Sequence, residues 1–242
     1  MTTYICSDIH GAYDRYKKLL EEINFSKDDE LWVVGDVVDR GKSGARILND
    51  MMKHSNMHLI IGNHEFMMLE YFNTLEKRGT PPGNSLWLSR SNGGLQTLKG
   101  LERFKEENRQ KIIEYVRNAY VQKVFNIDGK KIMLCHAFYV RGKDTLLLKD
   151  TTFAVADVAF WYSPYRNDDL YMPLQFYDEA DAFITGHVPT IFFGVDPPIL
   201  DGNVYNIDGG CAVTAFDKTK GCLCCIKLED FFTEEPTIII IK

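Results

Sequence analysis

Five short segments of this chain place acids, histidines or an asparagine directly after a run of apolar residues. They are Asp8-Ile-His10, Gly35-Asp36-Val-Val-Asp39-Arg40-Gly41, Gly62-Asn63-His64-Glu65, Cys135-His136-Ala137 and Thr185-Gly186-His187. Carboxylate oxygens and imidazole nitrogens are common ligands of divalent cations in proteins. The pattern therefore indicates a metal site assembled from several segments.

Each apolar run that precedes one of these segments is typical of a short β-strand. In an open α/β sheet, ligands collect in the crevice at the carboxyl ends of the strands, so we expect the five segments to converge there. Asp8 and His10 are two residues apart and can point the same way from an extended strand end. That pair suits one metal ion held by a carboxylate and an imidazole.

The rest of the chain alternates strands with amphipathic helices, as expected of an α/β domain. Apolar residues at a spacing of three to four predict helices over residues 13–23, 47–52, 65–76 and 102–118. Strands are predicted at residues 4–6, 31–34, 59–61, 121–127, 131–135, 182–185, 204–207, 222–228 and 237–241. We find no repeat or linker, so we expect one α/β domain of the α+β type over residues 1–242, with two packed mixed sheets and helices outside.

The composition is that of an ordinary globular protein and narrows the range of partners. The 242 residues include 34 acidic and 28 basic side chains, a net charge of −6, which disfavours a nucleic acid polymer or a membrane surface as partner. The longest apolar runs are too short to cross a bilayer, and no basic export signal precedes the first strand. We expect a cytoplasmic protein whose six cysteines are reduced and serve as small buried hydrophobes.

The ordered set of motifs resembles the signature of a known enzyme family. Asp8-Ile-His10, Gly-Asp36-Val-Val-Asp39-Arg40-Gly, Gly-Asn63-His64-Glu65, His136 and Gly-His187 are similar to the motifs of the phosphoprotein-phosphatase group of calcineurin-like metallophosphoesterases. The resemblance is to the branch that holds bacterial and phage serine/threonine phosphatases and diadenosine tetraphosphatases. It implies a four-layer α/β/β/α metallophosphoesterase sandwich and hydrolysis of phosphoric esters.

The resemblance also implies two divalent metal ions. Asp8, His10 and Asp36 would hold the first ion, and Asp36, Asn63, His136 and His187 would hold the second, with Asp36 shared between them. Manganese is the expected metal, although these oxygen and nitrogen ligands also suit iron, zinc, nickel or cobalt. In such pairs the metals make a water molecule nucleophilic, and it attacks phosphorus in line.

Four further residues take catalytic roles by the same resemblance. Arg40 and Arg166 would bind the phosphate oxygens, because a planar guanidinium can donate to two of them at once. His64 would act as the general acid that protonates the leaving oxygen, and Asp39 would orient it and raise its pKa.

Several of these residues also have plainer interpretations. Asp8 could be a helix N-cap, and Asp39 with Arg40 a surface ion pair. Glu65 is expected to stabilise a loop or helix start. Residues 87–94, which end in Asn-Gly-Gly, fit either a bacterial-branch motif or a turn followed by a helix. Asp208-Gly209-Gly210 resembles a late loop beside the site, although glycine-rich turns arise for many reasons.

Three functions follow from the motifs. The favoured one is a metal-dependent phosphatase that hydrolyses phosphoserine and phosphothreonine in proteins. The alternative is a symmetric dinucleoside-tetraphosphate hydrolase, and the aromatic residues Trp87, Trp161, Tyr162 and Tyr165 could either stack on its adenine or belong to the core or the groove wall. A non-catalytic binding module is the third, and it is disfavoured because every expected ligand and His64 are present. The substrate is therefore a phosphorylated protein or a small phosphoester or nucleotide. The sequence makes no prediction about the oligomeric state.

Overall fold

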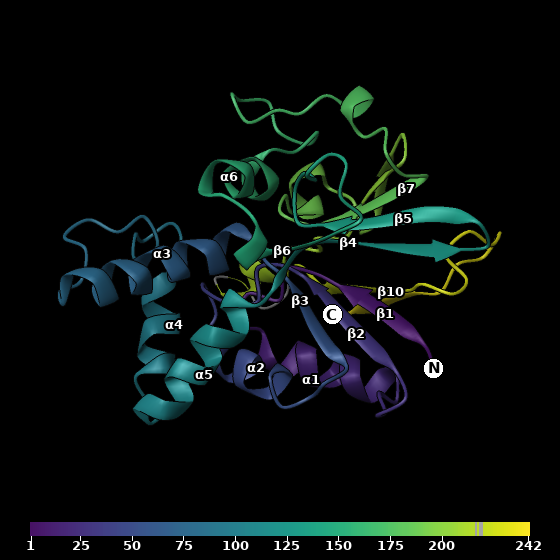
Figure 1. Cartoon of the computed structure of the whole chain (residues 1–242). Helices are drawn as coiled ribbons and strands as arrows, with labels where there is room; N and C mark the ends of the chain where they lie inside the picture. Colours follow the sequence, from purple (N-terminus) through teal and green to yellow (C-terminus); the bar gives the residue numbers. More distant parts are fainter. Residues whose placement is uncertain (216, 218–219) are drawn as a thin grey trace.

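The computed structural model describes residues 1–215, 217 and 220–242, and strands alternate with helices along the chain (Figure 1). The strands are β1 (Thr3–Cys6), β2 (Glu30–Val34), β3 (Met57–Ile60), β4 (Tyr120–Ile127), β5 (Lys130–Cys135), β6 (Thr145–Leu147), β7 (Ala182–Thr185), β8 (Ile199–Asp201), β9 (Val204–Asn206), β10 (Leu223–Lys227) and β11 (Ile238–Ile241). The α-helices are α1 (Tyr13–Glu22), α2 (Gly44–Met51), α3 (Asn63–Arg78), α4 (Gly94–Leu101), α5 (Glu106–Arg117) and α6 (Phe153–Trp161). The short 3-10 helices are η1 (Leu148–Asp150), η2 (Leu174–Phe176), η3 (Thr190–Phe193) and η4 (Cys211–Ala215).

The strands of the described residues form a mixed sheet in the order β11-β10-β1-β2-β3-β4-β5-β7-β9-β8, with β6 paired to β4. β1, β2 and β3 are parallel to one another, and so are β5, β7 and β9. The link between these two groups is narrow, because β3 and β4 share the single register pair Ile60 and Tyr120. The sheet therefore consists of two halves joined at one point.

The two halves pack face to face on an apolar layer. Ile5, Trp32 and Val34 from the first half share one buried cluster with Leu134 and Ile184 from the second. The alternate residues of the first strands point to the opposite face, as the period of two in a β-strand requires. The two packed mixed sheets expected from the sequence are these two halves of one sheet.

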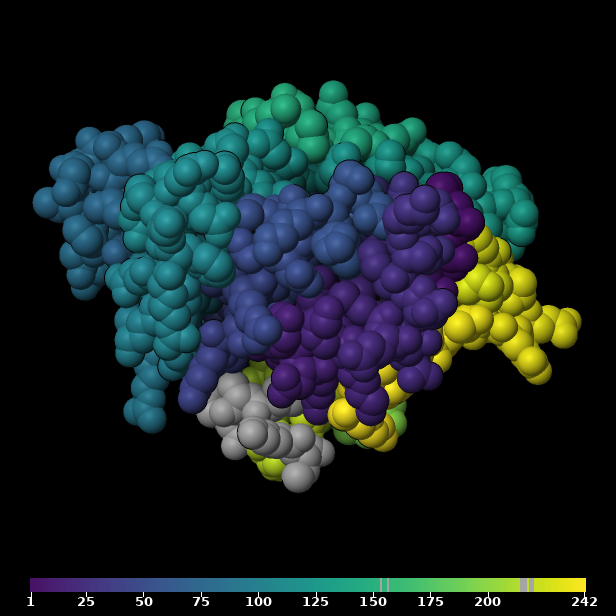
Figure 2. All heavy atoms as spheres, turned by 90° about the horizontal axis from the view of Figure 1, so that it is seen from below, coloured from purple at the N-terminus to yellow at the C-terminus, as the bar shows by residue number. Residues whose placement is uncertain are grey.

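Helices cover the outer face of the first half and give the fold its layers. Tyr16 of α1, Ile47 of α2 and Ile112 of α5 join Val33 and Leu59 of the sheet in a second buried cluster. From below, α1 and α2 in purple and blue cover this face, with the teal α4–α5 region beside them (Figure 2). Helix α6 lies near the ends of β4 and β5, above α3 (Figure 1), and its Phe160 packs against Phe66 of α3 with ring centroids 5.0 Å apart. The mixed α/β class is confirmed, with the helices on the outside as expected.

Some elements were not predicted from the sequence. Strands β6 and β8 are only three residues long, whereas α4 is the helix of the turn-and-helix interpretation of residues 87–94. Helix α6 has the sequence FAVADVAFW, which is apolar almost throughout and so has no period of 3.6 to detect. The helix predicted over residues 102–118 is shorter, since α5 begins at Glu106 and ends at Arg117.

All six cysteines are buried, as expected of residues that serve as small hydrophobes. Within the described residues, no helix is long and apolar enough to span a bilayer.

Candidate active site

The polar segments that follow the parallel strands meet at one edge of the sheet. The backbone N–H of Asp8 donates to the carbonyl of Gly35 at 3.0 Å, and that of Gly186 donates to the carbonyl of His136 at 2.9 Å. The N–H of His187 lies 3.2 Å from both carboxylate oxygens of Asp8, which connects the ends of β1 and β7. The convergence predicted from strand ends is confirmed for these segments.

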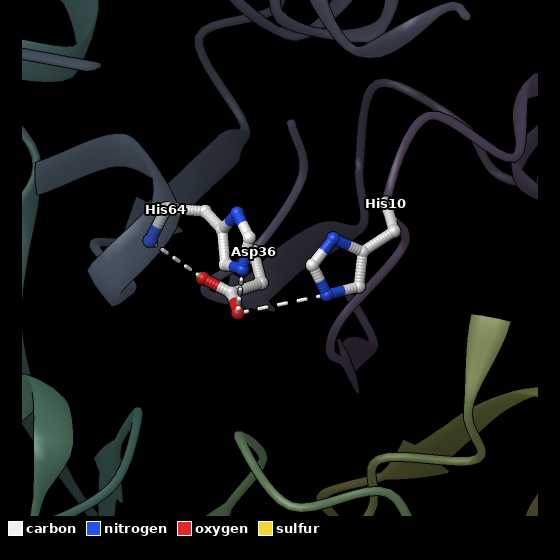
Figure 3. Close-up of side chains that lie close together, drawn as sticks. All are labelled: His10, Asp36 and His64. Atoms are coloured by element: carbon white, nitrogen blue, oxygen red, sulfur yellow. Dashed lines mark hydrogen bonds and ion pairs between the residues drawn. The ribbon is translucent and has the colours of Figure 1, made fainter. Parts of the chain in front are cut away.

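Asp36 lies at the centre of the site, facing three imidazoles (Figure 3 shows two of them, His10 and His64). Its Oδ2 is 3.6 Å from Nε2 of His10, 3.5 Å from Nε2 of His136 and 4.0 Å from Nε2 of His64. All four side chains are buried. Among the described residues, atoms that could bind a metal ion form two groups, His10 with Asp36 and His64, and Asp36 with His136 and His187, each with its atoms within 4.8 Å of one another.

Asn63 contributes to the second of these groups. Its Oδ1 lies 3.1 Å from Nε2 of His136 and 3.2 Å from Nδ1 of His187. The other ring nitrogen of His187 is buried and has no hydrogen-bond partner among the described residues. An orphaned buried nitrogen of this kind is costly unless a ligand binds it.

The tautomers of two histidines fit a metal site. Nδ1 of His10 donates to the carbonyl of Val38 at 2.9 Å, and Nδ1 of His136 donates to the carbonyl of Val34 at 3.1 Å. In the neutral ring the Nε2 lone pair then faces the carboxylate of Asp36, an arrangement that is unfavourable without a cation between the two. Metal-binding histidines typically have the other ring nitrogen fixed in this way.

The ionisable groups of the site also fit the binding of cations. Burial, together with Asp208 and Asp36, raises the pKa of Asp8 well above its ordinary value, and burial raises the pKa of Asp208 to about 7. Burial lowers the pKa of His10 and brings that of His187 to about 3, so both rings are neutral at pH 7. The side chains at the site therefore fit divalent cations, which would compensate the buried carboxylates.

The backbone of this region is strained. Of the eight described non-glycine residues with left-handed φ, six belong to the motifs: Asp8, His10, Asp36, Asp39, Arg40 and His187. L-residues adopt this conformation at a cost of about 1–2 kcal/mol each. Close packing explains two glycines, because a Cβ at Gly186 would overlap the carboxylate of Asp8, and one at Gly35 would overlap the ring of His136.

Two of the plainer interpretations of single residues can now be decided. Asp8 is not a helix cap, because α1 begins after Ala12 and has no side-chain cap. The expected structural role of Glu65 is confirmed, since its carboxylate accepts hydrogen bonds from the backbone N–H groups of Asp36, Val38 and Gly62 at 2.9–3.0 Å. Glu65 thereby fixes the loop that carries Asp36 to the start of α3.

His64 and Asp39 form a buried pair beside the central carboxylate. Nδ1 of His64 is 2.7 Å from Oδ2 of Asp39. Burial alone would lower the pKa of His64, but the carboxylates of Asp36 and Asp39 outweigh it and raise the pKa. Because Asp39 is fully buried, the alternative of a surface ion pair with Arg40 is wrong.

Both arginines line the same cavity as the central carboxylate. The cavity has a volume of about 410 Å³, and its walls include Asp36, His64, Arg40 and Arg166. Nη2 of Arg40 lies 3.4 Å from Nε2 of His64, and Arg166 forms an ion pair with Asp168. The guanidinium groups of two residues far apart in the sequence therefore border the space next to the candidate metal ligands.

Thr97 was not assigned a site role from the sequence, and the roles of Asp208 and Trp87 were left open between two interpretations. Asp208, after β9, lines the cavity. Trp87 and Thr97 both donate hydrogen bonds to Asp39, so the segment with the Asn-Gly-Gly motif is a turn and helix that also reaches the site. The alternative in which Trp87 stacks on a substrate base is wrong, because its side chain is 1% exposed.

Asp208→Asn should stabilise the metal-free protein, and more at pH 8 than at pH 5. Burial raises the pKa of Asp208 from 3.8 to about 7. Between about pH 4 and pH 7 the Asp208 carboxyl is therefore protonated in the folded protein but ionised in the unfolded chain. This carboxyl therefore destabilises the fold increasingly as the pH rises, and fully above about pH 7. Asparagine keeps an acceptor for the N–H of Gly210 but cannot ionise. Thermal unfolding of both proteins at the two pH values measures the effect, and an equal gain in Tm at pH 5 and pH 8 would contradict it.

The comparison with protein families gives a clear result. The calcineurin-like phosphoesterase model matches residues 1–190. This chain therefore belongs to the calcineurin-like phosphoesterase family. Members of that family are hydrolases of phosphoric esters with a dinuclear site for divalent metals, so the chain is an enzyme of this class.

Individual relatives resemble parts of the chain or its fold. The symmetrical bis(5'-nucleosyl)-tetraphosphatase of Wigglesworthia glossinidia brevipalpis is 35% identical over 79 residues, which make up 32% of this chain and 29% of that protein. The match thus spans less than a third of that curated relative.

Two solved structures share the fold over the whole chain. A candidate diadenosine tetraphosphatase aligns with a TM-score of 0.63 and 14% identity, covering 100% of this chain and 94% of that one. A protein serine/threonine phosphatase from Saccharomyces cerevisiae aligns with a TM-score of 0.60 and 12% identity, covering 100% and 80%. At these identities the likeness concerns the fold alone.

Proposed function

We propose that this chain binds two divalent ions, one through Asp8, His10 and Asp36 and the other through Asp36, Asn63, His136 and His187. The position of Asp36 between His10 and His136 supports its role as the shared ligand. Manganese is the metal we propose. Two such ions supply Lewis acidity toward phosphoryl oxygens and lower the pKa of water.

The protein side chains supply binding and proton transfer. Arg40 and Arg166, which both line the cavity, bind the phosphoryl oxygens by charge-assisted hydrogen bonds. His64, held by Asp39 at 2.7 Å, donates a proton to the leaving oxygen, and the carboxylates of Asp36 and Asp39, which raise its pKa, favour the protonated ring. Asp39 orients the ring through Nδ1 and leaves Nε2 directed toward the cavity.

The substrate class we propose is the phosphate monoester, with phosphoserine and phosphothreonine side chains in proteins as its members. The observation that carries this proposal is the joint placement of Asp36, His64, Arg40 and Arg166 on one cavity of about 410 Å³. In this arrangement Arg40 and Arg166 offset the two negative charges of a terminal phosphate, and His64 supplies the proton for its leaving group.

A symmetric dinucleoside tetraphosphate is the second candidate substrate. The curated relative named above supports it, and so do Trp161 and Phe192, which line the cavity. Phe192 is 71% exposed, so its ring is free to stack on a nucleobase. Trp161 lies on the wall next to His187, with ring centroids 6.0 Å apart.

A kinetic panel with added manganese separates the candidates. A phosphoserine peptide, a phosphothreonine peptide, diadenosine tetraphosphate and p-nitrophenyl phosphate are compared by kcat/KM at equal protein and metal concentration. The first proposal requires a higher kcat/KM for the phosphopeptides than for diadenosine tetraphosphate. Release of ADP at a much higher kcat/KM than phosphate from the peptides would replace it with the second candidate.

Arg166→Ala should lower kcat/KM for the preferred substrate by about 10- to 100-fold, because a hydrogen bond to a charged group contributes about 1.5–3 kcal/mol. Arg141→Ala is the matched control, since Arg141 forms a similar ion pair with Asp178 but does not line the cavity. Steady-state kinetics of both variants measure the difference. Equal activity of the two variants would exclude Arg166 from phosphate binding.

We also propose that residues 1–242 form one catalytic domain. The family match ends at residue 190, but Asp208 also lines the cavity, so the later residues complete the same site. The cytoplasmic location stays a prediction of the sequence.

A further inference from the structure

The carboxylate of Asp39 has more hydrogen-bond donors than an orienting partner of His64 requires. Its Oδ1 accepts from Oγ1 of Thr97 at 2.7 Å and from Nε1 of Trp87 at 3.0 Å. Its Oδ2 accepts from the same indole nitrogen at 2.9 Å and faces Nδ1 of His64 at 2.7 Å. The backbone N–H of Asp39 in turn donates to Oγ1 of Thr97 at 2.8 Å. One hydroxyl group thus binds both the main chain and the side chain of Asp39.

The two donors are themselves held rigidly. Trp87 packs against Tyr71 and Phe72 of α3, with ring centroids 5.2 Å and 6.0 Å apart. Thr97 is completely buried on α4, and the N–H of Gly94, where that helix begins, donates to the carbonyl of Trp87 at 3.1 Å. Both donors therefore belong to one packed segment, residues 87–97.

This segment also fits closely against the loop that carries Asp39. Gly93 has a φ of +77°, and a Cβ at this position would lie 2.8 Å from the backbone nitrogen of Arg40. A side chain there would push the segment away from the loop. The close approach lets Trp87 and Thr97 reach a carboxylate that would otherwise be buried with His64 as its only side-chain partner.

We propose that Trp87 and Thr97 are positioning residues for the proton transfer by His64. Indole N–H and threonine O–H are neutral donors, so they fix the Asp39 carboxylate without competing with the imidazole as a positive charge would. With Oδ1 bound by Thr97, Oδ2 is directed at Nδ1 of His64, and the ring keeps its Nε2 toward the cavity. This inference rests on the proposed role of His64 as the general acid.

Thr97→Val tests the proposal, because valine keeps the shape of threonine and removes the hydroxyl, and Thr97→Ser is the matched control that keeps it. With manganese, kcat and KM are measured for phenyl phosphate, a poor leaving group, and for p-nitrophenyl phosphate, a good one. We expect Thr97→Val to lower kcat for phenyl phosphate by roughly 10-fold, the effect of about 1–2 kcal/mol from a lost hydrogen bond. We expect a smaller loss with p-nitrophenyl phosphate, an unchanged KM, and near-wild-type values for Thr97→Ser. Trp87→Phe should show the same dependence on the leaving group.

A second measurement does not depend on turnover. In the metal-free protein, the Nδ1 proton of His64 should give a low-field NMR resonance, because it is hydrogen-bonded to a carboxylate. The resonance should shift or broaden in Thr97→Val and return in Thr97→Ser. An unchanged resonance in Thr97→Val, or the same loss of kcat with both substrates in the valine and serine variants, would overturn the positioning role. If His64→Asn itself loses equal activity with both leaving groups, the general-acid function fails, and the resonance alone then decides whether Thr97 positions the ring.

Discussion

Asp36→Asn should abolish turnover, with a loss in kcat/KM of at least about 10³-fold, and should reduce the amount of bound metal. The reason is geometric, because Asp36 is the one carboxylate that belongs to both groups of candidate ligands. Asparagine keeps one oxygen but loses the negative charge that would offset two cations. Activity and metal content per chain, determined by elemental analysis after dialysis, measure the two effects together.

Asp128→Asn provides a matched control for this substitution. Asp128 also has a left-handed backbone, with a φ of 51° compared with 52° for Asp36, but it lies on the turn between β4 and β5. The control separates the loss of a shared ligand from the effect of placing asparagine in this conformation. Full metal content and near-normal kcat/KM in Asp36→Asn would contradict the proposal that Asp36 is the ligand shared by both ions.

His64→Asn should leave metal binding intact and slow hydrolysis by roughly 10²–10⁴-fold, the usual range for general acid–base catalysis. The loss should be greatest for substrates with poor leaving groups and should shrink with p-nitrophenyl phosphate, whose leaving group needs little protonation. Kinetics with a series of substituted phenyl phosphates measure this dependence.

Metal content is the decisive control for His64, because its Nε2 lies 4.0 Å from Oδ2 of Asp36 and so faces the same space as His10. A metal ligand would lose bound metal on substitution, whereas a general acid would lose activity alone. His54→Asn, at an exposed position away from the cavity, controls for the substitution itself. Loss of metal from His64→Asn but not from His54→Asn would assign His64 to the ligands instead.

The sequence was sufficient to predict which segments meet at the site. Parallel strands bring their carboxyl ends to one edge, so Asp36 and His187 could be expected to lie near each other from local patterns alone. The same reasoning explains why the expected two sheets were largely correct: the alternation of buried residues along β1 and β2 supplies one face to the helices and one to the second half of the sheet.

Contacts that depend on the packing of whole elements could not be predicted in this way. The bond between Trp87 and Asp39 joins residues 48 positions apart, and it exists only because α4 docks against the loop after β2. Asp208 reaches the cavity through the pairing of β9 with β7; the resemblance of Asp208-Gly209-Gly210 to a loop beside the site indicated this position, but glycine-rich turns arise for many reasons and the pattern alone could not decide it. Helix α6 has no amphipathic period, and β6 and β8 are too short for a pattern of two to appear.

The left-handed backbone at six motif residues has a consequence for how the metal-free protein behaves. These loops are held in an unfavourable conformation by their hydrogen bonds and by the tight fit at Gly35 and Gly186, while like charges crowd within them. Part of the binding free energy of ions at this site therefore offsets the conformational strain and the charge repulsion of the loops. A chelating agent would therefore act on this molecule as a local denaturant, loosening one rim of the sheet while the layers behind it stay packed.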